Sequence, residues 1–415
     1  MAHYFFVRKW SHCKVSQHAA KTVNSIRRIS EFATVTPNPH KAPIMLHLGD
    51  PTLNIAFRKC QVVLDAVEKA LKSRAYEGYA PSIGHLEARD AIAKHFTHPD
   101  APITAEDVIL TSGCSHALQI VIESLANSGD NILIPSPGFP LYSTMMQPHL
   151  IEDRLYPLIM EENDVHIDLS KLEQLIDHRT RAIIVNNPSN PVGSAYPKSH
   201  LEDILKIAYR KRLPIIADEI YGNMVYNGSK FIPIATLKPQ VPIICCDGLS
   251  KRYMVPGWRI GWIIIHNRYG ALDEIYNGMI NLTQKIVGPC CLIQGALPTI
   301  LNEFPDDYLN EINKILSKNA EVIFYHINRI KGLTVIKPSG AMYIMIKIDL
   351  DYFKTTEAKF IKGLISEENL YCLPGEIFNA PPGYFRIVLT QPKNILYEAC
   401  QRIKNFCLKL RDSNK

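Results

Sequence analysis

A stretch near the middle of the chain, residues 247–262, reads Asp-Gly-Leu-Ser-Lys-Arg-Tyr-Met-Val-Pro-Gly-Trp-Arg-Ile-Gly-Trp. It follows a short apolar run, residues 242–246, which predicts a buried strand. Lys251 comes just after the turn that ends this strand, where desolvation favours the neutral, nucleophilic amine. Arg259 stays charged and suits a phosphate. A lysine for an aldehyde and an arginine for a phosphate together indicate pyridoxal phosphate.

The alternative for this stretch is a solvated lysine and an ordinary Pro-Gly turn, so the rest of the chain has to decide. Apolar runs alternate with helical patterns through the centre of the sequence. The candidate strands are residues 108–111, 131–135, 182–186, 214–217, 242–246 and 260–265. Most are continuous in Val, Ile and Leu, as is typical of strands buried on both faces. We therefore predict an α/β fold with a mainly parallel sheet and helices on both sides.

The pattern changes in the last quarter of the chain, which predicts a second, smaller domain. An amphipathic helical pattern covers residues 308–330, and short strands and loops follow it. We divide the chain into a basic N-terminal arm (1–43), a small α+β domain (44–60 plus 312–415) and a large domain (61–311).

Composition excludes several classes of protein. The 415 residues are 47% hydrophobic and 21% charged, as in a globular protein with a large core. No apolar run approaches the roughly 18 residues that span a bilayer, so we expect no membrane partner. The net charge of +6 comes from the arm, where seven Lys or Arg oppose one acid, whereas 39 basic and 39 acidic residues cancel elsewhere. A neutral body predicts no nucleic-acid partner.

The ten cysteines show no CxxC spacing, and the closest are the adjacent pairs Cys245-Cys246 and Cys290-Cys291. Adjacent cysteines in apolar segments are poor disulfide partners and poor zinc ligands. We expect buried, reduced thiols in an intracellular protein, and no metal site. The basic, acid-poor opening is also typical of a mitochondrial transit peptide, which leaves two possible locations.

Ligands of open α/β sheets bind beyond the carboxyl ends of the strands, and polar or aromatic residues follow each candidate strand. Strand 108–111 precedes Ser-Gly-Cys-Ser (112–115) at a helix start, which suits a phosphate. The next strands precede Phe139, an aromatic face, and Asn190, an amide for a phenolate oxygen. Asp218 follows strand 214–217, and a buried carboxylate there needs a cation such as a protonated pyridine nitrogen. Tyr221 is placed to bond the phenolate oxygen.

Each of these features has an ordinary explanation when it stands alone. Ser and Gly start helices, Pro- and Asn-rich segments form turns, and Asp caps helices. Their order along the chain favours the cofactor, because each comes at the end of its own strand.

With these motifs the chain resembles the fold-type I pyridoxal-phosphate enzymes, class I aminotransferases, and among them most closely the members that act on tyrosine. The resemblance extends over about residues 10–407. It includes Asn24-Ser-Ile-Arg, Leu48-Gly-Asp-Pro-Thr, Gly78-Tyr-Ala-Pro-Ser-Ile-Gly, Thr111-Ser-Gly-Cys-Ser, Asn186-Asn-Pro-Ser-Asn-Pro, Ala217-Asp-Glu-Ile-Tyr, Val255-Pro-Gly-Trp-Arg and Pro338-Ser-Gly-Ala-Met-Tyr. It implies a large domain on a mainly parallel seven-stranded sheet, a smaller α+β domain, and a homodimer with active sites at the subunit interface.

The resemblance also implies a role for each matching residue. Those implied to bind the cofactor are Lys251 through a Schiff base, Asp218 at the pyridinium nitrogen, Asn190 and Tyr221 at the phenolate oxygen, Phe139 on the ring, Gly113, Cys114, Ser115 and Arg259 at the phosphate, and Tyr79 from the neighbouring subunit. Lys251, Asp218 and Tyr221 are the implied catalytic residues, with Lys251 carrying the proton. Arg386 is implied to clamp the substrate α-carboxylate, with Asn190 and Gly49 also at the substrate.

The implied reaction takes L-tyrosine and 2-oxoglutarate to 4-hydroxyphenylpyruvate and L-glutamate. Alternatives are another fold-type I reaction, such as kynurenine, alanine or nicotianamine-type transamination or β-elimination, and a non-catalytic scaffold. Two positions depart from the pattern: Gly248 replaces a common phosphate-binding serine, and Ser250 replaces a usual alanine. No clear arginine for a distal carboxylate occurs around residues 280–290. The arm resembles that of cytosolic members, so we expect a cytoplasmic protein.

Overall fold

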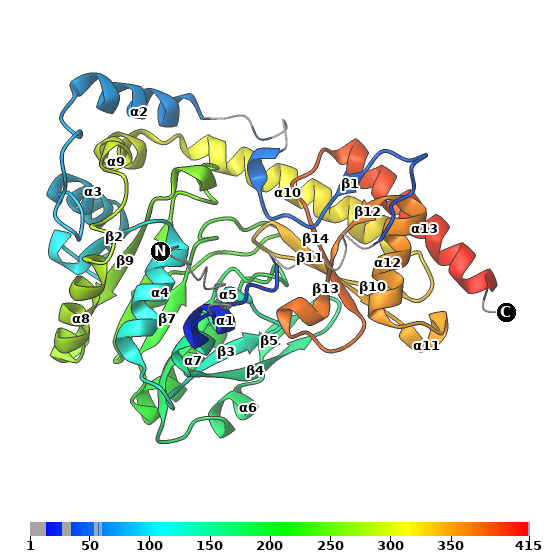
Figure 1. The fold of residues 1–415 in the computed structure, drawn as a ribbon, viewed down its shortest axis with the longest axis horizontal. Helices are drawn as coiled ribbons and strands as arrows, with labels where there is room; N and C mark the ends of the chain where they lie inside the picture. The colour runs from blue at the N-terminus through cyan, green and yellow to red at the C-terminus, as the bar shows by residue number, and fades with distance from the viewer. Residues whose placement is uncertain (1–13, 27–34, 54–56, 58–59, 414–415) are drawn as a thin grey trace, which may run out of the picture.

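The computed structural model describes residues 14–26, 35–53, 57 and 60–413, which form a larger and a smaller domain (Figure 1). The larger domain is built on an eight-stranded sheet and the smaller on a four-stranded one. This confirms the predicted α/β class with two domains of unequal size. Residues 1–13, which carry part of the transit-peptide hypothesis, lie outside the described residues.

The large sheet has the strand order β2-β9-β8-β7-β6-β3-β4-β5. Its strands are β2 (Val108–Thr111), β3 (Asn131–Ser136), β4 (Glu152–Met160), β5 (Val165–Ile167), β6 (Thr180–Asn186), β7 (Ile215–Asp218), β8 (Ile243–Gly248) and β9 (Gly261–His266). From β8 to β4 neighbouring strands are parallel, whereas β9 and β5 are antiparallel to their neighbours.

This sheet has eight strands where seven were expected. The six candidate strands all form, and β4 and β5 complete the sheet at one edge. Most side chains of β4 are exposed or half-buried, so its sequence contains no continuous apolar run that would mark a central strand. β4 lies next to the edge strand β5, and a strand with few buried side chains is harder to predict because it lacks the apolar pattern of a central strand.

Both faces of the central strands are covered, which explains their continuous apolar sequences. In β6, for example, Ile183 and Ile184 are both fully buried but belong to different hydrophobic cores. The helices on the Ile184 side are α4 (Cys114–Leu125), α5 (Leu141–Met146) and α8 (Asp273–Thr283). Those on the Ile183 side are α2 (Gln61–Ser73), α3 (Leu86–Phe96), α7 (Lys198–Lys211) and α9 (Cys291–Glu303). Because both faces of the strands are covered by apolar side chains, polar groups that could bind a ligand lie at the strand ends.

The smaller domain combines segments from both ends of the chain. Its antiparallel sheet has the order β10-β11-β14-β13, with β10 (Leu333–Ile336), β11 (Tyr343–Ile348), β13 (Leu373–Pro374) and β14 (Tyr384–Val388). A short strand after the arm, β1 (Ile44–Met45), pairs in parallel with β12 (Leu370–Tyr371). The helices here are α10 (Asp306–Ile327), α11 (Leu350–Phe353), α12 (Glu357–Glu368) and α13 (Lys393–Ser413). Figure 1 shows α10 running from the larger domain to the smaller one.

The segment before β1 is fastened to the smaller domain by buried polar contacts. Glu368 is fully buried and pairs with Lys41. The side-chain amide of Asn369 donates to the carbonyl of Lys41 at 2.6 Å, and Arg402 donates to the carbonyl of Ala42 at 2.7 Å. These contacts fix where β1 begins, and with it the residues after β1 that reach the cavity described below.

The nine described cysteines are all free. The prediction of buried thiols holds for Cys245 and Cys246, but it is wrong for the second pair, since Cys290 is exposed and Cys291 half-buried where α9 begins.

Among the described residues no helix is long and apolar enough to cross a membrane. The remaining short helices are α1 (Gln17–Lys21) and α6 (Leu169–Gln174).

Candidate active site

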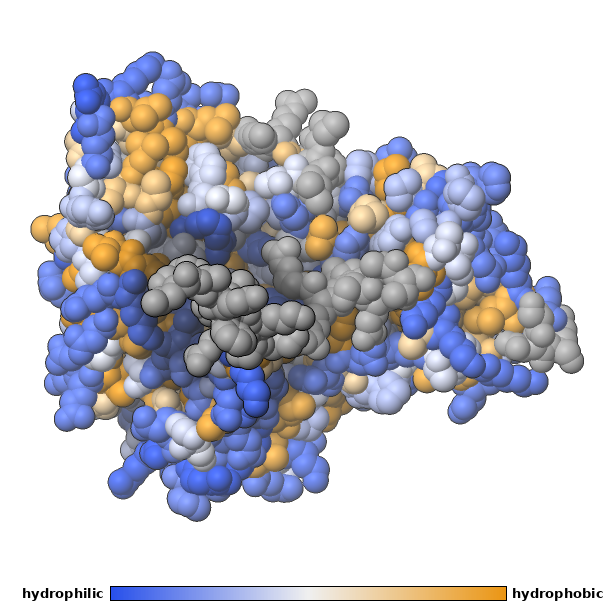
Figure 2. Space-filling model, viewed as in Figure 1, coloured by the Kyte–Doolittle hydropathy of each residue, from blue (hydrophilic) through white to orange (hydrophobic). Residues whose placement is uncertain are grey.

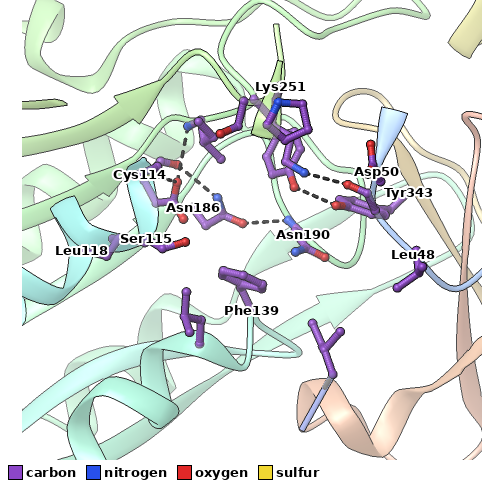
Figure 3. Close-up of a pocket in the computed structure, with 18 of the residues that line it drawn as sticks. Leu48, Asp50, Cys114, Ser115, Leu118, Phe139, Asn186, Asn190, Lys251 and Tyr343 are labelled. Atoms are coloured by element: carbon purple, nitrogen blue, oxygen red, sulfur yellow. Dashed lines mark hydrogen bonds between the residues drawn. The ribbon is translucent and has the colours of Figure 1, made fainter. Parts of the chain in front are cut away.

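The carboxyl ends of the parallel strands open into a cavity of about 590 Å³, shown in Figure 3. Ten of the twelve predicted site residues line it: Gly49, Cys114, Ser115, Phe139, Asn190, Asp218, Tyr221, Lys251, Arg259 and Arg386. The other two, Gly113 and Tyr79, do not. The lining residues come from strand-end loops of the larger domain and from β11, β14 and residues 48–50 on the other side.

Asp218 lies at the end of β7, where its carboxylate is buried among neutral donors. Oδ2 accepts a hydrogen bond from the Tyr142 hydroxyl at 2.5 Å, and Oδ1 one from the Cys114 thiol at 3.8 Å. Burial raises the pKa of this carboxyl to about 6, against the opposing effect of these hydrogen bonds. Among the described residues it forms no ion pair, so the site has room, electrostatically, for a cationic ligand.

Lys251 follows β8 and points into the cavity (Figure 3). Its Nζ donates to the backbone carbonyl of Gly49 at 2.8 Å and lies 5.8 Å from the centre of the Tyr221 ring. No carboxylate in the described part of the chain pairs with it. The amine is therefore held by a carbonyl, a contact that leaves it available for covalent chemistry.

Arg386 is the cationic counterpart of Asp218. The side chain, on β14, is only 2% exposed, and burial lowers its pKa. Nη1 donates to Oδ1 of Asn190 at 3.0 Å and Nη2 to the carbonyl of His47 at 2.7 Å, while Nε has no partner among the described residues. The guanidinium lies 4.2 Å from the ring centre of Tyr343 and 4.6 Å from that of Phe378. A buried cation with only neutral acceptors is suited to bind a carboxylate.

Asn190 was predicted both at the cofactor's phenolate oxygen and at the substrate. The structure ties its side-chain oxygen to Arg386, which leaves the NH₂ group as its donor. Its backbone N–H donates to Oδ1 of Asn186 at 2.7 Å, and Nδ2 of Asn186 donates to the backbone carbonyl of Asp218 at 3.1 Å. Asn186 thus joins two neighbouring strand-end loops, a role that the sequence did not predict.

The predicted phosphate site lies at the start of α4. Gly113 has φ 77°, and a Cβ there would lie 2.3 Å from Nη2 of Arg259, so only glycine lets the guanidinium approach this closely. Arg259 donates to the carbonyls of Ser112 at 3.2 Å and Pro256 at 3.0 Å. A cation therefore lies against the free N–H groups that begin at Cys114, an arrangement that binds anions.

Two glycines keep this phosphate end compact. Gly248 pairs with Gly261 across β8 and β9. A Cβ at Gly248 would lie 2.6 Å from the Ile260 carbonyl, and one at Gly261 would lie 2.4 Å from the backbone nitrogen of Cys114. The serine that the family resemblance leads one to expect at position 248 therefore does not fit this backbone. Arg259 and the N–H groups at the start of α4 remain as the hydrogen-bond donors for an anion.

Phe139 lines the cavity and packs edge-to-face on Tyr142, with ring centres 5.7 Å apart. Tyr79, in contrast, is 94% exposed and does not line the cavity. Ser115 lines the cavity at the first turn of α4. The Cys114 side chain points to Asp218, so only its backbone N–H faces the anion end.

A second buried carboxylate lies close by, on the neighbouring strand, but outside the cavity. Asp247 forms an ion pair with Arg252, and both side chains are almost fully buried. The Arg252 guanidinium also stacks 5.4 Å from the centre of the Phe96 ring. Burial raises the pKa of Asp247 to about 6 and that of the adjacent acid Glu219 to about 8. Asp247 and Arg252 neutralise each other's charge, so this ion pair needs no ligand.

A family model described as "Aminotransferase class I and II" matches residues 42–403. The chain belongs to this family. Its relatives include the tyrosine aminotransferase of Caenorhabditis elegans, 48% identical over 399 residues (96% of this chain and 86% of that protein). The human tyrosine aminotransferase is 46% identical over 402 residues, which are 96% of this chain and 88% of that one.

Solved structures show the same fold for this aminotransferase. A tyrosine aminotransferase from Leishmania infantum superposes with a TM-score of 0.92 at 31% identity, covering 97% of this chain and 99% of that one. An alanine aminotransferase from Pyrococcus furiosus gives a TM-score of 0.88 at 32% identity, covering 95% and 100%. Because both share the fold, the fold alone does not fix the amino donor.

Class I and II aminotransferases are known as pyridoxal-phosphate enzymes, and the cavity of this aminotransferase fits that cofactor. Asp218 is a buried carboxylate that forms no ion pair among the described residues, although the charge of Lys251 acts on it from a distance, so it can pair with a pyridinium nitrogen. Arg259 against Gly113 forms a cradle for a phosphate. Lys251 lies in the same cavity with its amine facing neutral groups.

Besides Asn186, three residues of the aminotransferase site have no predicted role. Tyr142 and Tyr343 lie within stretches noted in the sequence, but nothing there shows that their hydroxyls reach Asp218 and Tyr221. His47 contributes only its backbone carbonyl, which no side-chain pattern reveals. The signal for the two tyrosines was their position in motifs whose other residues already had roles.

Proposed function

We propose that this aminotransferase binds pyridoxal phosphate and converts L-tyrosine and 2-oxoglutarate into 4-hydroxyphenylpyruvate and L-glutamate. One observation carries the proposal: a buried carboxylate and a buried guanidinium, each without a counter-charge among the described residues, share one cavity with Lys251. Tyrosine as the donor is supported by relatives that bear that enzyme's name at 39–48% identity over nearly the whole chain.

Asp218 would hold the protonated ring nitrogen of the cofactor, and Tyr142 keeps that carboxylate in place. Arg259 and the start of α4 would hold the phosphate, while Phe139 would cover one face of the ring. When bound, pyridoxal phosphate supplies an electron sink for the pair released when the substrate Cα–H bond breaks.

Arg386 binds the α-carboxylate of the substrate. A guanidinium has five N–H donors, and the contacts to Asn190 and His47 use two of them. The remaining donors, including the unpaired Nε–H, permit a bidentate contact. The Tyr343 and Phe378 rings keep water from the guanidinium and so strengthen this contact.

Lys251 moves the proton. Its Nζ accepts the proton that leaves the substrate Cα. The Gly49 carbonyl, 2.8 Å away, holds the amine in the cavity between transfers. Apolar side chains on the cavity wall favour an aromatic substrate side chain, because they gain free energy from covering it. These side chains are Ile26, Leu48, Leu118, Phe139 and Leu141.

The proposed enzyme is a homodimer in which Tyr79 reaches the phosphate of the partner's site. Its 94% exposure supports this, because the ring touches little of its own chain. Nearby, Ile286 and Val287 are also largely exposed, and the following Gly288 packs against Ser82 of the Tyr79 loop. Figure 2 shows further apolar surface where α2 and α9 lie. We place the protein in the cytoplasm, with mitochondria as the alternative.

The test is a substrate panel with purified protein and added pyridoxal phosphate. Tyrosine with 2-oxoglutarate should yield 4-hydroxyphenylpyruvate, and Lys251→Ala should abolish both this product and the visible absorbance of the bound cofactor. Activity with alanine and none with aromatic amino acids would overturn the substrate assignment. Pyruvate and ammonia released from cysteine conjugates without a keto acid would favour β-elimination, and a colourless wild-type protein would favour a scaffold.

A further inference from the structure

Tyr343, the first residue of β11, lies at the meeting point of several site residues, as Figure 3 shows. Its hydroxyl is 2.8 Å from that of Tyr221, and both side chains are buried. Its ring carries the Arg386 guanidinium at 4.2 Å. A Cβ at Gly49 would lie 2.3 Å from the Tyr343 hydroxyl. One residue of the smaller domain thus contacts three groups with separate proposed roles.

The backbone before Tyr343 is fastened to the larger domain. The N–H groups of Ser339 and Gly340 both donate to the Gly193 carbonyl, at 2.7 and 2.8 Å, and that of Ala341 donates to Met224 at 2.9 Å. The Tyr226 hydroxyl donates to the carbonyl of Gly340 at 3.0 Å. The Tyr343 hydroxyl is therefore held in a set position relative to Tyr221, although the two residues belong to different domains.

Counting hydrogens decides which tyrosine donates. Each hydroxyl has one hydrogen and can accept others. If Tyr221 gives its hydrogen to the cofactor's phenolate oxygen, as proposed above, Tyr343 must be the donor in the bond between them. The Arg386 cation over the Tyr343 ring draws electron density from it and makes its hydroxyl a better donor. A hydroxyl that accepts such a bond becomes a stronger donor itself.

We propose that Tyr343 is a positioning residue whose hydroxyl donates to Tyr221, and so orients the Tyr221 hydrogen toward the cofactor's phenolate oxygen. The inference rests on the proposed function, because it needs the cofactor in this cavity. It also accounts for Gly49, whose carbonyl Lys251 bonds: a side chain there would displace the Tyr343 hydroxyl.

The inference is tested by titrating the absorbance of the bound cofactor. A hydrogen bond donated to the phenolate oxygen lowers the pKa of the nearby nitrogen of Lys251, since less negative charge remains to hold its proton. Tyr343→Phe should therefore raise the titration midpoint by about half a unit to one unit. Tyr221→Phe should raise it more, and Tyr221→Phe/Tyr343→Phe no further than Tyr221→Phe alone.

Tyr226→Phe is the matched control, because it removes a buried hydroxyl that donates to Gly340, in the segment before Tyr343, and bonds no site residue. It should leave the midpoint unchanged. An unshifted midpoint in Tyr343→Phe, an equal shift in Tyr226→Phe, or additive shifts in the double variant would overturn the inference while the proposed function stood. A wild-type protein without a cofactor band would overturn both.

A readout without cofactor comes from Gly49→Ala. Its methyl group would meet the Tyr343 hydroxyl, so the apoprotein should melt at a lower temperature than wild type. Adding Tyr343→Phe removes the clashing atom and should restore part of the loss. Gly49→Ala with Tyr226→Phe should show no such recovery; if it recovers equally, the assigned contact is wrong.

Discussion

Two buried acids on neighbouring strands of this aminotransferase have different partners. Asp218 on β7 and Asp247 on β8 are both fully buried, and burial raises the pKa of each to about 6. Asp247 forms an ion pair with Arg252 and lies outside the cavity, whereas Asp218 lies inside it and, among the described residues, accepts hydrogen bonds only from neutral donors, with Lys251 acting on it from a distance. Burial and a shifted pKa are therefore common to both, and the missing counter-charge is what marks the ligand site.

The same contrast holds for the cations. Arg252 is paired with an acid, while Arg386 has only an amide and a carbonyl as acceptors. The molecule thus contains one closed pair, Asp247 with Arg252, in which each charge has its counter-charge. It also contains two open charges of opposite sign, Asp218 and Arg386, which form no ion pair among the described residues. An open charge costs stability in the empty protein and returns that free energy when its ligand binds.

The largest effect is expected from Asp218→Asn, which removes the open acid but keeps its shape. Loss of a buried charge pair with the ring nitrogen should lower kcat for tyrosine by roughly 10²- to 10⁴-fold. The apoprotein, in contrast, should become more stable at pH 8. Keto-acid formation and urea unfolding of the apoprotein measure the two effects, and unchanged kcat would break the comparison.

This stability difference carries a pH signature. The folded-state pKa of Asp218 is raised from 3.8 to about 6, so the folded protein holds its proton more tightly than the unfolded chain. The resulting stability is present below pH 3.8 and is lost as the pH rises through 6. Wild type should fall behind Asp218→Asn by roughly 3 kcal/mol as the pH rises from below 3.8 to 8, and by about 1.4 kcal/mol of that between pH 5 and pH 8. A gap that narrows with rising pH would contradict this.

A smaller effect is expected from Arg386→Met, which removes the open cation. The KM for tyrosine should rise by about a hundredfold, because the substrate carboxylate loses a desolvated partner. The affinity for pyridoxal phosphate should stay the same, since the anion site at Arg259 is separate. Steady-state kinetics and cofactor titration separate the two. An equal loss of cofactor affinity would show that Arg386 supports the fold of the site instead.

The smallest effect on catalysis is expected from the closed pair. Asp247→Asn strands Arg252 as a buried cation, and the free energy of unfolding should fall by roughly 3–5 kcal/mol. Asp247→Asn/Arg252→Met should recover part of it. The KM for tyrosine should stay within about twofold of wild type in all folded variants. A tenfold change would mean that the pair acts on the cavity through the adjacent Lys251.

The strand-end residues were predictable because a parallel sheet brings all carboxyl ends to one edge. Asp218, Phe139 and Lys251 follow continuous apolar runs, and the sheet geometry then places them together. The family resemblance added Arg386, which no strand pattern of the larger domain indicates. The structure brings that side chain to the same cavity, whereas the domain boundaries drawn from the sequence stay a prediction.

Other features depend on contacts between segments that are distant in sequence. The partner of Arg386 is the backbone of His47, and that of Lys251 is the backbone of Gly49; backbone atoms carry no residue signature. Tyr343 acquires its position from the pairing of β11 with β14 and from the contacts of residues 339–341 with the larger domain. The strand β4 was not predicted because most of its side chains are exposed or half-buried, so it has no continuous apolar run.

The pairing of β1 with β12 sets an order of assembly during synthesis. Ile44–Met45 leaves the ribosome early, but its partner is translated only after the whole larger domain. Domains fold as units, and the earliest ones fold first during synthesis. The larger sheet therefore forms before Leu370–Tyr371, the strand that pairs with β1, has been translated. Lys251 is then already in place when the carbonyl of Gly49 arrives. The cavity is consequently the last part of the molecule to be completed, and a nascent chain carries no finished catalytic site before its C-terminal segments are made.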